Sequence, residues 1–135
     1  MISLTQIVLS NNKLASINSK FSNITFKINR TGTSYVSCYT DFFRKNLYPD
    51  IIYLKGDNQS IIKYNYDFNR TDNLVQLIWY NHIDNCGSLF RVCSNITEID
   101  LSYFNTSKVT NSFAMFYSCS SLSSLNLSNF DNQQL

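Results

Sequence analysis

The pattern of apolar and polar residues repeats itself in the last third of the chain. The segment LFRVCSNITEIDLSYFN, residues 89–105, matches MFYSCSSLSSLNLSNFD, residues 115–131, after a shift of 26 positions. Such a regular repeat predicts an array of similar structural units, each buried against the next. The aligned pairs are Leu89/Met115, Phe90/Phe116, Cys93/Cys119, Ile96/Leu122, Ile99/Leu125, Leu101/Leu127 and Phe104/Phe130.

Each repeat contains two different periodicities, which predict a helix followed by a strand. In the first half, apolar residues recur at steps of 4, 3 and 3, as Val109, Phe113, Phe116 and Cys119. This spacing is typical of one face of a helix, and Thr106 or Ser107 is placed to cap its first turn. In the second half, apolar and polar residues alternate, which is typical of a strand with one buried face.

The polar residues of the two predicted strands are our candidate binding site. Leu125 and Leu127 are expected to point into the core, so the side chains between and after them should point outward. The outward face of a repeat array is the surface that such proteins commonly use for recognition. We therefore expect a partner-binding concave face made of Glu98, Asp100, Ser102, Ser124, Asn126 and Ser128.

The repeat resembles a known family. The pattern C-x-x-L/I-x-x-L/I-x-L-S-x-F, followed by a Ser/Thr-rich linker and M-F-x-x-C, resembles the BspA-like leucine-rich-repeat surface proteins of bacteria and protists over residues 83–135. The resemblance implies an α/β repeat fold, a short leucine-rich-repeat solenoid preceded by a small, mainly β module. It also implies a surface-exposed adhesion protein. Ser112 and Ala114 depart from the pattern, since larger apolar residues are common there.

The chain divides into three expected parts. Residues 1–20 are a lead-in segment, residues 21–80 a small β module that caps the repeats, and residues 81–135 the array, with one degenerate and two clear coils. In the module, NITFKI, SYVSC, DIIYLK, SIIKYNYDF and NLVQLIW read as strands, Gly56 as a hairpin turn, and FFRKNL as a helical turn. Because the array stops at Leu135, we expect the chain to be a fragment of a longer protein with further repeats.

Candidate chemistry is sparse in this sequence. The four cysteines, Cys38, Cys86, Cys93 and Cys119, have no zinc-ligand spacing, and His82 belongs to no catalytic motif. We expect no metal, no cofactor and no enzymatic activity. Cys93 and Cys119 hold equivalent positions, so they should be buried neighbours, either as inert thiols or, in an oxidising compartment, as a disulfide.

Charge and hydropathy leave two hypotheses about function. The formal net charge of +2 gives no indication of nucleic-acid binding, and no run is long enough to span a bilayer. The first hypothesis is a cell-surface or secreted adhesion module that binds a protein, such as a host-cell or extracellular-matrix protein. The alternative is an intracellular scaffold. No signal peptide is present in this chain, so the surface location follows from the resemblance alone.

Overall fold

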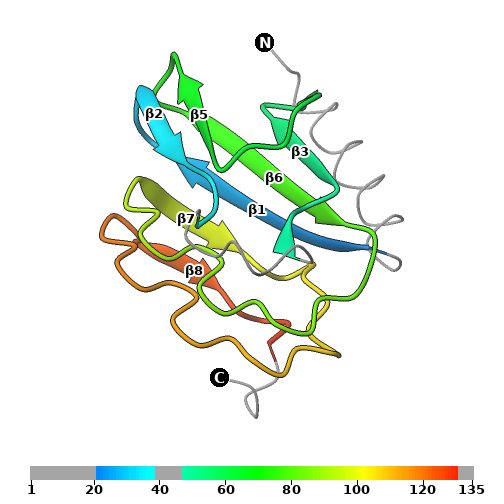
Figure 1. Cartoon of the computed structure of the whole chain (residues 1–135). Helices are drawn as coiled ribbons and strands as arrows, with labels where there is room; N and C mark the ends of the chain where they lie inside the picture. Colours follow the sequence, from blue (N-terminus) through cyan, green and yellow to red (C-terminus); the bar gives the residue numbers. More distant parts are fainter. Residues whose placement is uncertain (1–20, 39–46, 131–135) are drawn as a thin grey trace.

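The computed structural model describes residues 21–38 and 47–130 of the chain (Figure 1). The lead-in and most of the FFRKNL turn lie outside these ranges. The described residues form a six-stranded sheet in the order β4-β3-β6-β1-β7-β8 and a two-stranded sheet of β2 and β5. The strands are β1 (Ser22–Ile28), β2 (Gly32–Tyr35), β3 (Ile51–Leu54), β4 (Asp57–Asn58), β5 (Asn65–Phe68), β6 (Asn73–Trp79), β7 (Ile96–Asp100) and β8 (Ser124–Asn126).

Strand β1 lies at the centre of the large sheet and connects its two halves. It is antiparallel to β6, with Phe26 opposite Val75, and antiparallel to β7, with Phe26 also opposite Ile99. Ile24, Phe26 and Ile28 alternate with polar residues, and all three are buried. The alternation therefore fixes which face of β1 meets the core. One sheet thus runs through both the expected β module and the expected repeats.

The turn predicted at Gly56 is confirmed. Lys55 and Gly56 have φ angles of 53° and 88° and connect β3 to β4. Two residues with positive φ are the requirement of a type I′ hairpin turn. The strand that follows, β5, pairs with β2 and not with β3.

The predicted α/β leucine-rich-repeat fold is wrong. No α-helix occurs among the residues that the structure describes, and the fold is nearly all β. Residues 109–119, predicted as a helix, form turns and extended backbone, and Phe113 on the expected buried face is 80% exposed. No helix in the described ranges could span a membrane.

The 26-residue sequence repeat is present in the structure as two similar stretches of chain, which we call the first coil (residues 85–104) and the second coil (residues 111–130). Strands β7 and β8 are parallel, with Ile99 opposite Leu125. Asn85 forms an isolated parallel bridge with Asn111. Both pairs are 26 residues apart, so the two coils lie side by side in the register of the sequence repeat.

Hydrogen bonds between the coils explain why the helix does not form. The N–H groups of Ser88, Phe90 and Val92 donate to the carbonyl oxygens of Phe113, Met115 and Tyr117, at 2.9, 2.9 and 2.8 Å. In an α-helix these carbonyls would accept from the residue four positions later in the same segment. Buried backbone N–H and C=O groups need a hydrogen-bond partner, and here the neighbouring coil supplies that partner in place of the helix.

Each coil also contains two residues whose backbone conformation is incompatible with an α-helix. Ser88 and Val92 in the first coil have φ of 60°, and their equivalents Ala114 and Ser118 have φ of 54° and 60°. Positive φ at a residue other than glycine interrupts a right-handed helix and carries strain. The same two positions are affected in both coils, so the turns are a property of the repeat.

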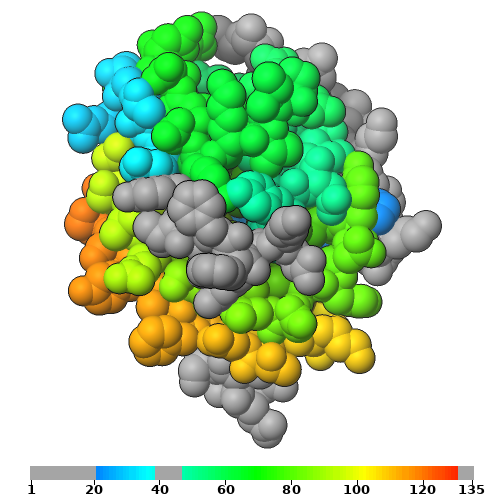
Figure 2. All heavy atoms as spheres, in the orientation of Figure 1, coloured from blue at the N-terminus to red at the C-terminus, as the bar shows by residue number. Residues whose placement is uncertain are grey.

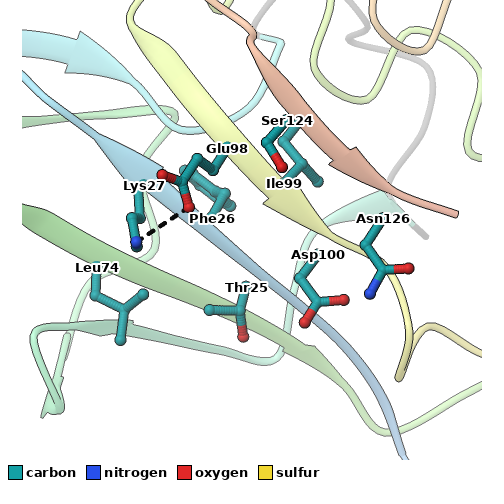
Figure 3. A pocket seen from close by; sticks show the side chains of 9 residues that line it. All are labelled: Thr25, Phe26, Lys27, Leu74, Glu98, Ile99, Asp100, Ser124 and Asn126. Carbon is teal, nitrogen blue, oxygen red and sulfur yellow. Dashed lines mark ion pairs between the residues drawn. The ribbon is translucent and has the colours of Figure 1, made fainter.

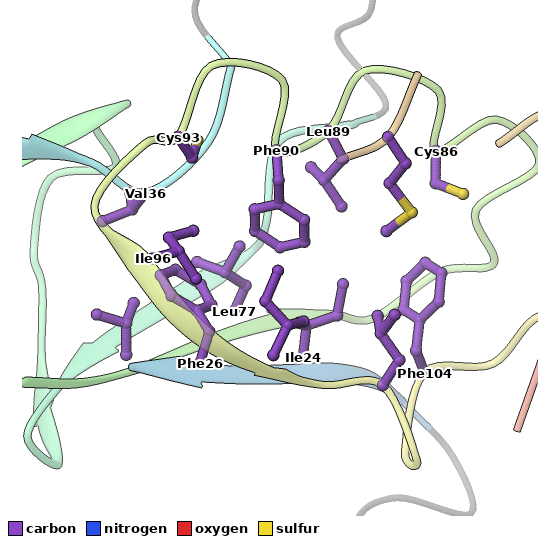
Figure 4. Close-up of a cluster of buried hydrophobic side chains, with 14 of the residues drawn as sticks. Ile24, Phe26, Val36, Leu77, Cys86, Leu89, Phe90, Cys93, Ile96 and Phe104 are labelled. Carbon is purple, nitrogen blue, oxygen red and sulfur yellow. The ribbon is translucent and has the colours of Figure 1, made fainter. Parts of the chain in front are cut away.

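The core lies between the large sheet and the turns of the coils (Figure 4). Phe90 points from the first coil toward the sheet, where its ring meets that of Phe26 edge-on at 5.4 Å. The ring of Phe116 is stacked on that of Phe90 at 6.2 Å. Phe104 and Phe130 form a second stacked pair at 6.2 Å. The repeat thus places aromatic residues in columns, which bury their faces against each other.

Equivalent positions in β7 and β8 should contribute differently to stability, because β8 pairs with a strand on one side only among the described residues. Ile99 is 2% exposed, whereas Leu125 in the same register is 36% exposed. We predict that Ile99→Ala lowers the free energy of unfolding by about 2–5 kcal/mol and Leu125→Ala by only about 1 kcal/mol. Denaturant unfolding of both variants provides the measurement. Equal losses would contradict the assigned burial of the two strands.

Candidate functional site

A groove crosses the outer face of the large sheet, on the side opposite the core (Figure 3). Its volume is about 300 Å³. Four strands, β6, β1, β7 and β8, contribute to its floor and walls. The lining residues are Thr25, Phe26, Lys27, Leu74, Glu98, Ile99, Asp100, Ser124 and Asn126.

Strand pairing brings the polar side chains of the groove together. Lys27 of β1 lies opposite Glu98 of β7, and Thr25 opposite Asp100. A β-bulge beside Lys27 leaves one extra residue in β7, and the alternation after it directs Glu98 and Asp100 outward. The parallel pairing with β8 then sets Ser124 beside Glu98. Lys27, Glu98 and Ser124 thus share one surface although they are far apart in the sequence.

One ion pair lies in the groove. Lys27 Nζ is 3.0 Å from Glu98 Oε2, and both side chains are 48% exposed. A pair this accessible stabilises a fold by about 0–1 kcal/mol, because water screens it. The pair balances one carboxylate only. Asp100 accepts a hydrogen bond from the Ser102 N–H at 2.9 Å, and no ion pair to it is found in the described part of the chain, so the groove carries a net negative charge.

The structure separates the six residues of the predicted binding face into two groups. Glu98, Asp100, Ser124 and Asn126 line the groove. Ser102 and Ser128 instead lie in the turns that follow the strands, where their N–H groups donate to Asp100 Oδ1 and Asn126 Oδ1. Such turns are favoured by Asp and Asn two residues earlier. The two serines therefore shape the ends of β7 and β8 and do not line the groove.

Sequence reasoning missed the part of the groove that β1 and β6 contribute. Thr25, Lys27 and Leu74 belong to the predicted β module, and Leu74 is 41% exposed. The sequence predicted the strand NITFKI but not that its polar residues would line a groove. Nothing in the sequence indicated that β1 would pair with β7, because strand pairing over about 70 residues leaves no local signal.

The four cysteines form no disulfide bond with one another in the described residues. Cys93 is 1% exposed, as expected for a buried apolar position, whereas Cys119 is partly exposed. The Cys119 thiol donates to the Phe90 carbonyl at 3.1 Å. Burial raises the pKa of Cys93, with further upward contributions from Cys119 and Cys38, and burial raises the pKa of Cys119 to about 11. Both are therefore poor nucleophiles at neutral pH.

His82 lies in the stretch of chain that follows β6. It is exposed, and its Nδ1 is 3.5 Å from the Asn105 side-chain nitrogen. Among the described residues, no group of three or more His, Cys, Asp or Glu side chains could hold a metal ion. The groove on the outer face is accordingly the site on which we base a function.

The raised pKa values predict slow and pH-dependent thiol chemistry. Iodoacetamide should modify Cys93 and Cys119 much more slowly in the folded chain than in the unfolded chain at neutral pH, and the Cys119 rate should keep rising until about pH 11. Peptide mass spectrometry would measure both rates. Modification of folded and unfolded chains at equal rates would contradict the burial of these thiols.

The same shift predicts a loss of stability in alkali. The folded-state pKa of Cys119 lies near 11, above its ordinary value of 9.0, so the folded chain retains a proton that the unfolded chain releases. The stabilisation is present below pH 9 and should be lost as the pH rises toward 11. Cys119→Ala should flatten this part of the profile of unfolding free energy against pH.

Comparisons of the chain with protein-family models, with curated proteins and with solved structures found no match. The resemblance to BspA-like proteins therefore stays a prediction from the sequence.

Proposed function

We propose that this chain is a non-catalytic module that binds a protein segment through the groove on the outer face of its sheet. The observation that carries the proposal is the groove itself, in which β1, β7 and β8 present side chains that donate and accept hydrogen bonds around a net negative charge. Following the resemblance of residues 83–135, the proposal includes a location at the cell surface or outside the cell.

The shape and chemistry of the groove favour an extended segment as the ligand. Its polar residues follow the two-residue alternation of the strands, so they lie at the spacing of side chains in a second extended chain. Leu74 adds an exposed apolar contact at one side. Asp100 is a carboxylate without an ion-pair partner among the described residues, and it favours a Lys or Arg on the ligand.

The paired carboxylate can also contribute to recognition. Glu98 and Lys27 are half-exposed, so a basic ligand side chain can approach Glu98 without displacing a buried charge. Electrostatic complementarity of this kind raises the association rate and selects partners by charge. We infer that the ligand is an extended, basic peptide segment of a partner protein.

A titration with a designed peptide tests the proposal. The probe is a short peptide of alternating Thr and Lys, which favours an extended backbone and places its charges on one face. Two-dimensional NMR should show shifts at β1, β7 and β8. Replacing both Glu98 and Asp100 by Lys should weaken binding by about tenfold or more, since two attractive charges become repulsive.

A matched control separates the groove from the overall charge. Asp57→Lys with Asp72→Lys makes the same change in net charge at exposed positions that do not line the groove. This variant should keep nearly the affinity of the unaltered chain. Equal weakening by the two double variants, or tighter binding of an alternating Thr/Glu peptide, would refute the proposed site.

A further inference from the structure

Cys93 and Cys119 lie beside each other in the two coils. Just before them in the repeat, the Val92 N–H donates to the Tyr117 carbonyl at 2.8 Å. Just after them, β7 and β8 pair in the 26-residue register. Residues in register on adjacent strands lie about 4.8 Å apart, and disulfide bonds join Cα atoms that are about 4.4 to 6.8 Å apart. The spacing of the coils therefore suits a disulfide between these two residues.

The sulfur of Cys119 reaches the turn that contains Cys93. The Cys119 thiol and the Cys93 N–H both donate to the Phe90 carbonyl, at 3.1 and 3.0 Å. Burial raises the pKa of Cys119, and a hydrogen bond with the Cys93 backbone opposes that rise. Both observations place the Cys119 sulfur against Cys93, without an intervening side chain.

The two thiols differ in their access to solvent. Cys93 is 1% exposed, whereas Cys119 is partly exposed. Figure 2 shows the second coil, in orange, on the surface of the molecule beside the yellow-green first coil. A small reagent can therefore reach Cys119 directly, and Cys93 can then react with the sulfur that lies beside it.

The other two cysteines are less suited to such a bond. Cys86 is also buried in the first coil, but the equivalent residue of the second coil is Ser112, which has no thiol. Figure 4 shows Cys86 and Cys93 at opposite ends of the turns of the first coil. Cys38 is buried, so a reagent reaches it less readily than it reaches Cys119.

We propose that Cys93 and Cys119 form a disulfide bond between the two coils when the chain folds in the presence of a small-molecule disulfide, such as oxidised glutathione. During folding, before burial, the Cys119 thiolate attacks one glutathione sulfur, and the other glutathione leaves as a thiolate. The Cys93 thiolate then attacks the Cys119 sulfur and releases the second glutathione. The two cysteines lose two electrons and two protons in total, and one glutathione disulfide becomes two glutathione thiols.

The disulfide would hold the second coil against the first. It closes a loop of 26 residues and so restricts the unfolded chain. The loop contains β7, and β8 follows it directly, so the bond supports two of the strands that line the groove. Such bonds persist in oxidising compartments, which agrees with the location outside the cell proposed above. The disulfide itself does not depend on any ligand of the groove.

Refolding of the 135-residue chain in a mixture of oxidised and reduced glutathione tests the proposal. Peptide mapping without reduction should find the Cys93–Cys119 disulfide in most chains, with a mass about 2 Da below that of the reduced chain. The unfolding equilibrium constant of the oxidised chain should be about a hundredfold lower than that of the reduced chain. In denaturant, the same glutathione mixture should produce this disulfide at about a tenth of that yield or less, because the coils are then apart.

Two matched variants separate this pair from the other thiols. Cys119→Ala should abolish both the disulfide and the gain in stability on oxidation, whereas Cys86→Ala should keep both. Circular dichroism should show that both variants are folded. The proposal would be overturned by four reduced thiols after refolding in excess oxidised glutathione, by a disulfide that involves Cys38 or Cys86 instead, or by an oxidised chain no more stable than the reduced one.

Discussion

The structure depends on the hydrogen bonds that join the two coils in a 26-residue register. They give the backbone of each turn segment a partner outside its own segment, and they set β8 beside β7. Stacked pairs such as Phe90 and Phe116 follow from the same register. Without these hydrogen bonds the N–H groups of Ser88, Phe90 and Val92 would lose their backbone acceptors, in turns that already carry the strain of positive φ angles.

The position of β1 determines how the two hydrogen-bonded coils join the rest of the sheet. By pairing antiparallel with β7, β1 covers one side of the first coil, and among the described residues no strand pairs with the far side of β8. The same pairing places Lys27 and Thr25 beside the carboxylates of β7. Strand β1 therefore covers one side of the two stacked coils and also completes the groove. The proposed binding site depends on the same strand pairing as the fold.

The sequence revealed the repeat but not its conformation. The 26-residue period and the alternation around Leu125 were readable because they are local or periodic signals. The spacing of Val109, Phe113 and Phe116 suited a helix, yet the carbonyls of that segment bond to residues about 25 positions away. The positive φ angles of Ser88 and Val92 could not be predicted from the sequence, because neither residue is glycine or asparagine, the residues that most often adopt this conformation.

Amide hydrogen exchange followed by NMR tests the inter-coil ladder most directly. The amides of Ser88, Phe90 and Val92 should exchange slowly, because each donates to the second coil. The equivalent amides of Ala114, Phe116 and Ser118 should exchange rapidly. Equal protection in both segments, together with the strong sequential amide contacts of a helix over residues 109–119, would contradict the account.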